Sequence, residues 1–139
     1  MILLDTSGIL AALDKSERFH RSTRDVLLAE AQPAVMSPLV LAESDYLLTR
    51  NLGPSFALDL AAEVAVGAYE LAPLDREDVG EAVRVVQHFL NLGIGLTDAS
   101  IVVLAERYDC NRVLTLDERH FRALRTLNGR PFTLLPADA

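Results

Sequence analysis

The chain has 139 residues, half of them hydrophobic, and a formal net charge of −7. This length fits one domain, residues 1–139, around a single core. The acidic balance argues against a general polyanion binder, because non-specific nucleic-acid affinity comes from lysine and arginine. Charged residues interrupt the most apolar run, so we expect a protein that does not enter a membrane. The N-terminus lacks the basic segment of a signal peptide, and Cys110, the one cysteine, cannot form an internal disulfide. We therefore expect a cytoplasmic protein.

In the first half of the chain, short buried strands alternate with helices. Residues 2–4 form an uninterrupted apolar run, as in a strand buried on both faces of a parallel sheet. Ser37-Pro38 is a strong helix start, with serine as the cap and proline in the first turn. The predicted elements here are strands at 2–4 and 34–36, and helices at 7–13 (capped by Asp5 or Thr6), 17–31, 38–50 and 55–66.

The second half continues the alternation. Asp75 predicts the cap of a helix whose apolar stripe contains Val79 and Val83, and either Thr97 or Asp98 predicts the cap of the next. Pro131 places the last strand at an edge of the sheet. The predicted elements are strands at 69–72, 112–116 and 131–135, and helices at 76–91, 97–108 and from 118. The order predicts an α/β fold of three layers, with about five short parallel strands between helices.

Two aspartates directly follow predicted strands. Asp5 ends the first strand and Asp117 ends the strand that contains Leu114. Parallel strands end at one edge of the sheet, and ligands of open α/β sheets bind at that edge. Each aspartate alone is explained by capping of the helix that follows it, but the pair indicates a shared site.

Glu43 lies among apolar neighbours in its predicted helix, with Leu39 and Val40 one turn before it and Leu47 one turn after. This spacing predicts a carboxylate that faces the core and needs a partner, because burial of an unpaired charge is costly. The partner is a metal ion, a hydrogen-bond network or an arginine, with Arg50 and Arg112 as the candidates for an internal ion pair.

Asp98 repeats the pattern at the start of a helix, where a first-turn aspartate is also favoured by the helix dipole. Together with Asp5, Glu43 and Asp117 it completes a set of four acids, and Mg²⁺ or Mn²⁺ requires several oxygen ligands of this kind. Neighbouring hydroxyls, those of Thr6 and Thr115 among them, are suited to orient carboxylates or water.

Other chemistries lack their residues. The chain has no phosphate-binding glycine-rich loop around Lys15, its only lysine. Cys110 has no neighbouring histidine, which favours a structural thiol over a nucleophile. The three histidines lack the spacing of a zinc site, and His20 and His120 are interpreted as surface or phosphate-contacting residues.

The ordered set of motifs resembles the PIN-domain ribonucleases, and among them the VapC toxins of bacterial toxin–antitoxin pairs. It consists of Leu4-Asp5-Thr6-Ser7, Ser37-Pro38 with Glu43, Leu96-Thr97-Asp98-Ala99, and Thr115-Leu116-Asp117 followed by His120-Phe121. The resemblance implies a PIN-like fold over the whole chain. It also implies a catalytic quartet of Asp5, Glu43, Asp98 and Asp117, with metal bound by Asp5, Asp98 and Asp117 and support from Thr6 and Thr115.

The implied activity is hydrolysis of RNA phosphodiester bonds with Mg²⁺ or Mn²⁺ as cofactor. The implied partners are an RNA substrate, a cognate antitoxin that blocks the acidic crevice, and a second copy in a homodimer. Candidate RNA contacts are Arg18, Arg21, Arg24, Arg119 and Arg122; a solvated helix face explains each of them equally well. Two alternatives stay open: a non-catalytic interaction module with the same fold, and a PIN nuclease of RNA processing outside toxin–antitoxin biology.

Overall fold

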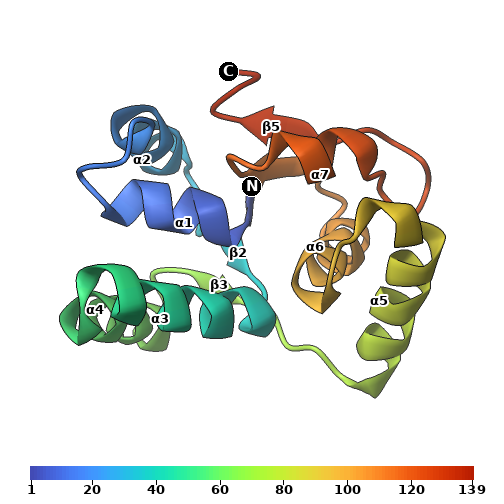
Figure 1. Ribbon diagram of the computed structural model, residues 1–139, viewed down its shortest axis with the longest axis horizontal. Coiled ribbons are helices and arrows are strands. Elements are labelled where there is room, and N and C mark those ends of the chain that lie inside the picture. Colours follow the sequence, from blue (N-terminus) through green and yellow to red (C-terminus); the bar gives the residue numbers. More distant parts are fainter.

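The computed structural model describes residues 1–139, and its centre is a five-stranded sheet in which every neighbouring pair of strands is parallel (Figure 1). The strand order is β3-β2-β1-β4-β5, so the first strand of the chain is the middle strand of the sheet. The strands are β1 (Leu3–Leu4), β2 (Val35–Met36), β3 (Glu70–Leu71), β4 (Arg112–Leu114) and β5 (Thr133–Leu135).

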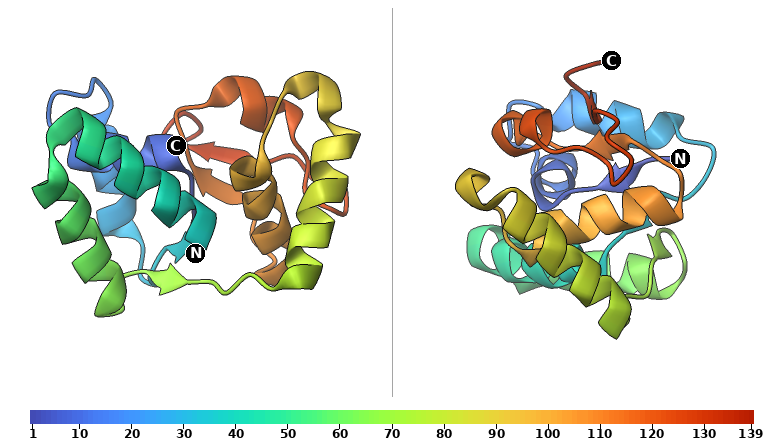
Figure 2. Two further views of the ribbon diagram at one scale, coloured as in Figure 1. Left: turned by 60° about the horizontal axis from the view of Figure 1, so that its bottom comes forward. Right: turned by 90° about the vertical axis from the view of Figure 1, so that its right-hand side faces the viewer.

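Helices surround this sheet and pack mainly as pairs that follow one another in the chain, α1 with α2, α3 with α4, and α5 with α6. In Figure 1, α3 and α4 lie at the lower left and α5 at the right; Figure 2 shows β3 between these two groups. The helices are α1 (Thr6–Leu13), α2 (His20–Ala29), α3 (Pro38–Leu52), α4 (Pro54–Ala65), α5 (Arg76–His88), α6 (Leu96–Arg107) and α7 (Glu118–Ala123), with a 3₁₀ turn at Leu90–Leu92. The predicted three-layer α/β fold is confirmed.

The core is built on the central strands and on α6. The β1 residues and the β4 residues Val113 and Leu114 are fully buried, and α6 is buried without interruption from Ala99 to Ala105. The two residues of β3 are exposed, as befits an edge strand. Side chains that follow β1 and β4 are therefore held by the most rigid part of the molecule.

Two predicted helix starts are wrong. α2 begins at His20, not at residue 17, because Asp14 accepts hydrogen bonds from the amide and the hydroxyl of Ser16 and holds a turn there. α6 begins at Leu96 with Gly95 as its cap, so Asp98 lies inside the first turn and its carboxylate does not cap the helix. Asp98 is thereby free for other contacts.

The predicted caps Ser37 and Asp75 are confirmed. The Ser37 hydroxyl accepts a hydrogen bond from the amide of Leu39, and Asp75 forms a reciprocal capping box with Asp78. Asp5 occupies the cap position of α1, but its side chain forms no capping hydrogen bond.

Most of the predicted apolar stripe of α5 does not face the core, although its member Val86 packs against it. Val79 and Val83 are 46% and 41% exposed, and the helix packs on α6 through Ala82 and Val85. Helical spacing identifies a face of a helix, but which of two adjacent apolar faces is covered depends on the neighbouring helix. No helix of the chain combines the length and the apolar character needed to cross a bilayer.

Candidate functional site

The four predicted acids line one cavity of about 290 Å³ at the carboxyl edge of the sheet. Each comes from a different part of the fold: Asp5 follows β1, Glu43 lies on α3, Asp98 lies in the first turn of α6, and Asp117 follows β4 and caps α7. The remaining lining residues are Thr6, Ser7, Leu10, Leu47, Gly95 and Thr97. The structure thus brings together all members of the quartet that the sequence indicated.

Asp5 is the most deeply placed of these acids and is only 5% exposed. Its Oδ2 atom accepts hydrogen bonds from the hydroxyls of Ser7 and Thr115, each at 2.7 Å. Burial raises the pKa of Asp5, and the two hydroxyl donors oppose that shift. The carboxylate is therefore held in one orientation inside the crevice.

Thr115 and Ser7 also fix the end of β4 relative to β1. The Thr115 hydroxyl accepts a hydrogen bond from the amide of Asp117 at 2.9 Å, and the Ser7 hydroxyl accepts one from the amide of Leu116 at 2.9 Å. Thr115 is 1% exposed, so this network is shielded from water. It sets the spacing between Asp5 and Asp117.

Asp98, Asp117 and His120 form a tight cluster at the mouth of the crevice. The Nδ1 atom of His120 lies 3.0 Å from Oδ2 of Asp98 and 2.9 Å from Oδ2 of Asp117. Burial raises the pKa of Asp98 to about 6, the charge of Asp5 adds to the rise, and His120 opposes it. Burial and the neighbouring negative charges disfavour the ionised form of Asp98, and a cation bound beside it would favour that form.

Glu43 does not face the core as predicted. It is exposed on the solvent side of α3, where it reaches the rim of the cavity, while Val40 and Ser44 take the buried positions. It forms no ion pair, and Arg112 instead binds Glu30 at 2.7 Å. The expectation of an internal ion pair for Glu43 is wrong, because an exposed carboxylate needs no partner.

His120 is the site residue that sequence reasoning missed. It was interpreted as a surface or phosphate-contacting residue, whereas its ring lies between two acids of the quartet. The available signal was its position three residues after Asp117 at the start of a helix, since residues three apart share one helix face. His20, in contrast, contacts only the backbone carbonyl of Ala11, at 2.8 Å.

The predicted RNA-contacting arginines are not equally available. Arg122 is held by Glu118 at 2.9 Å and by Asp138 at 2.6 Å, and these acids raise the pKa of its guanidinium. Arg18 lies over the ring of Phe19, 5.2 Å from its centroid. The other three, Arg21, Arg24 and Arg119, are exposed and form no ion pair within the chain.

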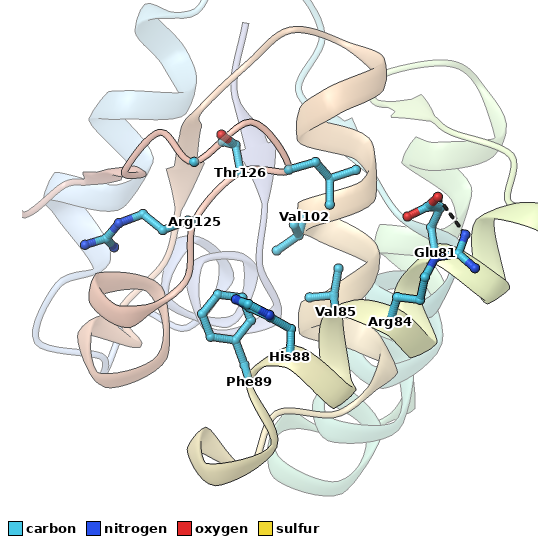
Figure 3. Close-up of a pocket in the computed structure, with 10 residues that line it drawn as sticks. Glu81, Arg84, Val85, His88, Phe89, Val102, Arg125 and Thr126 are labelled. Atoms are coloured by element: carbon cyan, nitrogen blue, oxygen red, sulfur yellow. Dashed lines mark hydrogen bonds and ion pairs between the residues drawn. The ribbon is translucent and has the colours of Figure 1, made fainter.

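A second cavity, of about 480 Å³, lies between α5, α6 and the segment after α7 (Figure 3). Its charged groups are already engaged: Arg84 binds Glu81 at 2.6 Å, and Arg125 donates to backbone carbonyls at the end of α7. The rest of its lining is largely apolar, with Val85, Val102 and Leu127 among the residues. It lacks a set of converging acids, so the acidic crevice is the candidate site.

The residues of the crevice fit a hard divalent cation. Several carboxylate oxygens converge, and Asp98, Asp117 and His120 can place three ligand atoms within 4.8 Å of one another. The hydroxyl oxygen of Thr6 is buried beside them and has no hydrogen-bond partner in the chain. Water on a hydrated ion would supply that partner.

A parallel sheet between helices, with acidic residues gathered at its carboxyl edge, is the architecture of a PIN domain. The PIN domain family model matches residues 2–127, and the chain belongs to this family. Ribonuclease VapC26 of Mycobacterium tuberculosis is 40% identical over 135 residues, which cover 97% of this chain and 100% of that protein.

Solved structures support the fold at lower sequence identity. The toxin VapC20 of Mycobacterium tuberculosis superposes with a TM-score of 0.79 at 17% identity, over 85% of this chain and 91% of the other. The FitAcB structure from Neisseria gonorrhoeae has a TM-score of 0.68 at 18% identity, over 96% and 97% of the two chains. A VapBC complex from Salmonella typhimurium, bound to DNA, has a TM-score of 0.65 at 19% identity, over 96% and 98%.

Proposed function

We propose that this chain is a metal-dependent endoribonuclease of the VapC type, with residues 1–139 forming a single PIN domain. The observation that carries the proposal is the convergence of Asp5, Glu43, Asp98 and Asp117 on one cavity from four separate elements. Membership in the PIN-domain family and the likeness over its whole length to a protein named a ribonuclease support it.

Asp98 and Asp117, with Asp5 behind them, are the proposed holders of Mg²⁺ or Mn²⁺. A divalent cation bound there supplies Lewis-acid activation of the attacking water and neutralises charge on the phosphodiester. The Thr115 hydroxyl donates a hydrogen bond to the Asp5 carboxylate and accepts one from the Asp117 amide, and so holds these two residues at a fixed separation. To Glu43, exposed at the rim, we assign acceptance of a proton from water or the holding of water beside the substrate. To Thr6, which also lines the cavity, we assign support of that water.

The candidate RNA surface extends from the crevice toward the start of α2. Phe19 and Ser22 of this region line a pocket of about 210 Å³ together with Leu116 and Glu118, which flank Asp117. Arg18 and Arg119 are the chain neighbours of two of these residues. We assign Arg18, Arg21, Arg24 and Arg119 to phosphate contacts and leave out Arg122, whose charge Glu118 and Asp138 neutralise.

An antitoxin, a second copy and a cytoplasmic location complete the proposal. Several of the similar structures are toxin–antitoxin complexes, which supports an antitoxin as partner. An acidic crevice suits a partner segment that offers arginine. The homodimer is supported by large apolar side chains that the single chain leaves exposed, among them Leu58, Val66 and Leu90.

Cleavage of a pool of small structured RNAs by the purified chain, free of antitoxin, tests the activity. We expect discrete fragments with Mn²⁺ or Mg²⁺, none with EDTA, and a loss of about a hundredfold or more in Asp98→Asn, because that change removes a carboxylate oxygen from the cluster. Metal-independent fragments, or full activity of Asp98→Asn, would contradict the proposal.

A matched pair on α3 tests the role of Glu43. Glu43→Gln removes the carboxylate at the rim of the cavity, and we expect it to slow cleavage. Asp45→Asn removes an exposed carboxylate two residues away that does not line the cavity, and we expect it to leave the rate unchanged. Equal effects of both substitutions would refute a specific role for Glu43.

A further inference from the structure

The imidazole of His120 lies inside the acid cluster. Its Nδ1 atom is 3.0 Å from Oδ2 of Asp98 and 2.9 Å from Oδ2 of Asp117. Neighbouring ligands of one ion, with bonds of about 2.1 Å at right angles, are themselves about 3 Å apart. In the metal-free chain these contacts are a hydrogen bond and ion pairs, and the same separations are compatible with three ligands of one shared cation.

The fold holds the ring in this position. Asp117 caps α7 by accepting a hydrogen bond from the His120 amide at 3.0 Å. The next residue, Phe121, is fully buried and packs edge-to-face on Phe132, with ring centroids 5.7 Å apart. The first turn of α7 is thus anchored on both sides of His120, and its side chain, 20% exposed, points toward Asp98.

A second and independent feature points to a ligand in the same crevice. Thr6 is one of the residues that line the cavity, the residue is 3% exposed, and its buried hydroxyl oxygen has no hydrogen-bond partner in the chain. A buried hydroxyl without a partner costs free energy, so such groups are normally satisfied by water or a ligand. A hydrated cation bound in the crevice would offer such a partner.

We propose that His120 is a nitrogen ligand of the divalent cation, alongside Asp98 and Asp117, and that the site consequently favours Mn²⁺ over Mg²⁺. This deepens the proposed function, since the cation is the cofactor of the proposed nuclease. Mg²⁺ prefers an all-oxygen octahedron and retains its water, whereas imidazole nitrogen favours transition-metal ions. Among these, Mn²⁺ is the ion that also suits carboxylates.

Pulsed electron paramagnetic resonance of bound Mn²⁺ tests the assignment, because a directly coordinated imidazole couples its ¹⁴N nucleus to the metal spin. We expect this coupling in the full chain loaded with Mn²⁺ and its loss in His120→Gln. The control His88→Gln changes an exposed histidine on α5 that lines the other cavity, and it should retain the coupling. Calorimetry should show Mn²⁺ affinity reduced about tenfold or more in His120→Gln, and Mg²⁺ affinity reduced much less.

Two results would overturn the assignment: Mn²⁺ bound to the unaltered chain without nitrogen coupling, and coupling that persists in His120→Gln. His120→Asn, with circular dichroism of both variants, guards against a folding defect. RNA cleavage measured on the same samples separates this inference from the nuclease proposal. Cleavage without nitrogen coupling refutes the ligand alone, and nitrogen coupling without cleavage refutes the nuclease alone.

Discussion

Gly8 tests whether the contact between α1 and β4 positions the site. The glycine lies in α1, and an added Cβ atom would lie 2.7 Å from the carbonyl carbon of Leu114 and closer still to its oxygen. Leu114 is fully buried in strand β4, which pairs with both β1 and β5 and therefore has no room to withdraw. Gly8→Ala must therefore push α1 away from the sheet.

The size of the effect follows from two opposed terms. Alanine in place of glycine stabilises a helix interior by about 0.5–1 kcal/mol, while overpacking of a core costs about 1–3 kcal/mol. We expect Gly8→Ala to lose about 1–2 kcal/mol, a fall in Tm of roughly 3–6 °C for a chain of this size. Gly80→Ala on α5 is the matched control, since nothing lies within 4 Å of its added Cβ, and it should gain about 0.5–1 kcal/mol.

Urea and thermal unfolding of the metal-free proteins, followed by circular dichroism at one protein concentration, measure both changes. Mn²⁺ affinity should fall in Gly8→Ala, because Asp5 precedes α1 while Asp117 follows β4, and it should be unchanged in Gly80→Ala. A Gly8→Ala protein as stable as the Gly80→Ala protein would refute the inferred contact between α1 and β4.

Four further outcomes are expected. Because protonated Asp98, with its pKa of about 6, cannot bind a cation, and a histidine ligand must be neutral, Mn²⁺ affinity from calorimetry should rise by about tenfold or more per pH unit as the pH is raised toward 6; a flat profile would contradict this. The folded Asp98 carboxyl keeps its proton to higher pH than the unfolded one, so its contribution to stability is lost as the pH rises from about 4 to about 6; in urea unfolding of the metal-free proteins, the stability of the unaltered chain relative to Asp98→Asn should fall over this range. Thr115→Val should cost about 1–3 kcal/mol in urea unfolding and slow RNA cleavage, because Asp5 loses a donor and the Asp117 amide loses its acceptor. Mn²⁺ at 100 times its Kd should stabilise the protein by about 2.7 kcal/mol in thermal unfolding, and EDTA should reverse this gain. A similar gain in Asp98→Asn would argue against the cluster as the binding site.

The amino-acid pattern alone is enough to predict the parallel α/β fold and the positions of the two strand-end aspartates. Uninterrupted apolar runs mark strands buried on both faces, and parallel strands must end at one edge, so Asp5 and Asp117 had to meet there. The caps at Ser37 and Asp75 were equally predictable, because a cap depends only on residues within one turn.

Which helix faces pack against neighbouring helices, and which side chains of different elements come into contact, is visible in the three-dimensional structure alone. Glu43 and the Val79–Val83 stripe have the spacing of core residues and yet are exposed, because burial depends on the helix that packs alongside. His120 meets Asp98 because α7 and α6 converge at the edge of the sheet. Spacing along one helix carries no information about such contacts, because they arise from the packing of distant segments.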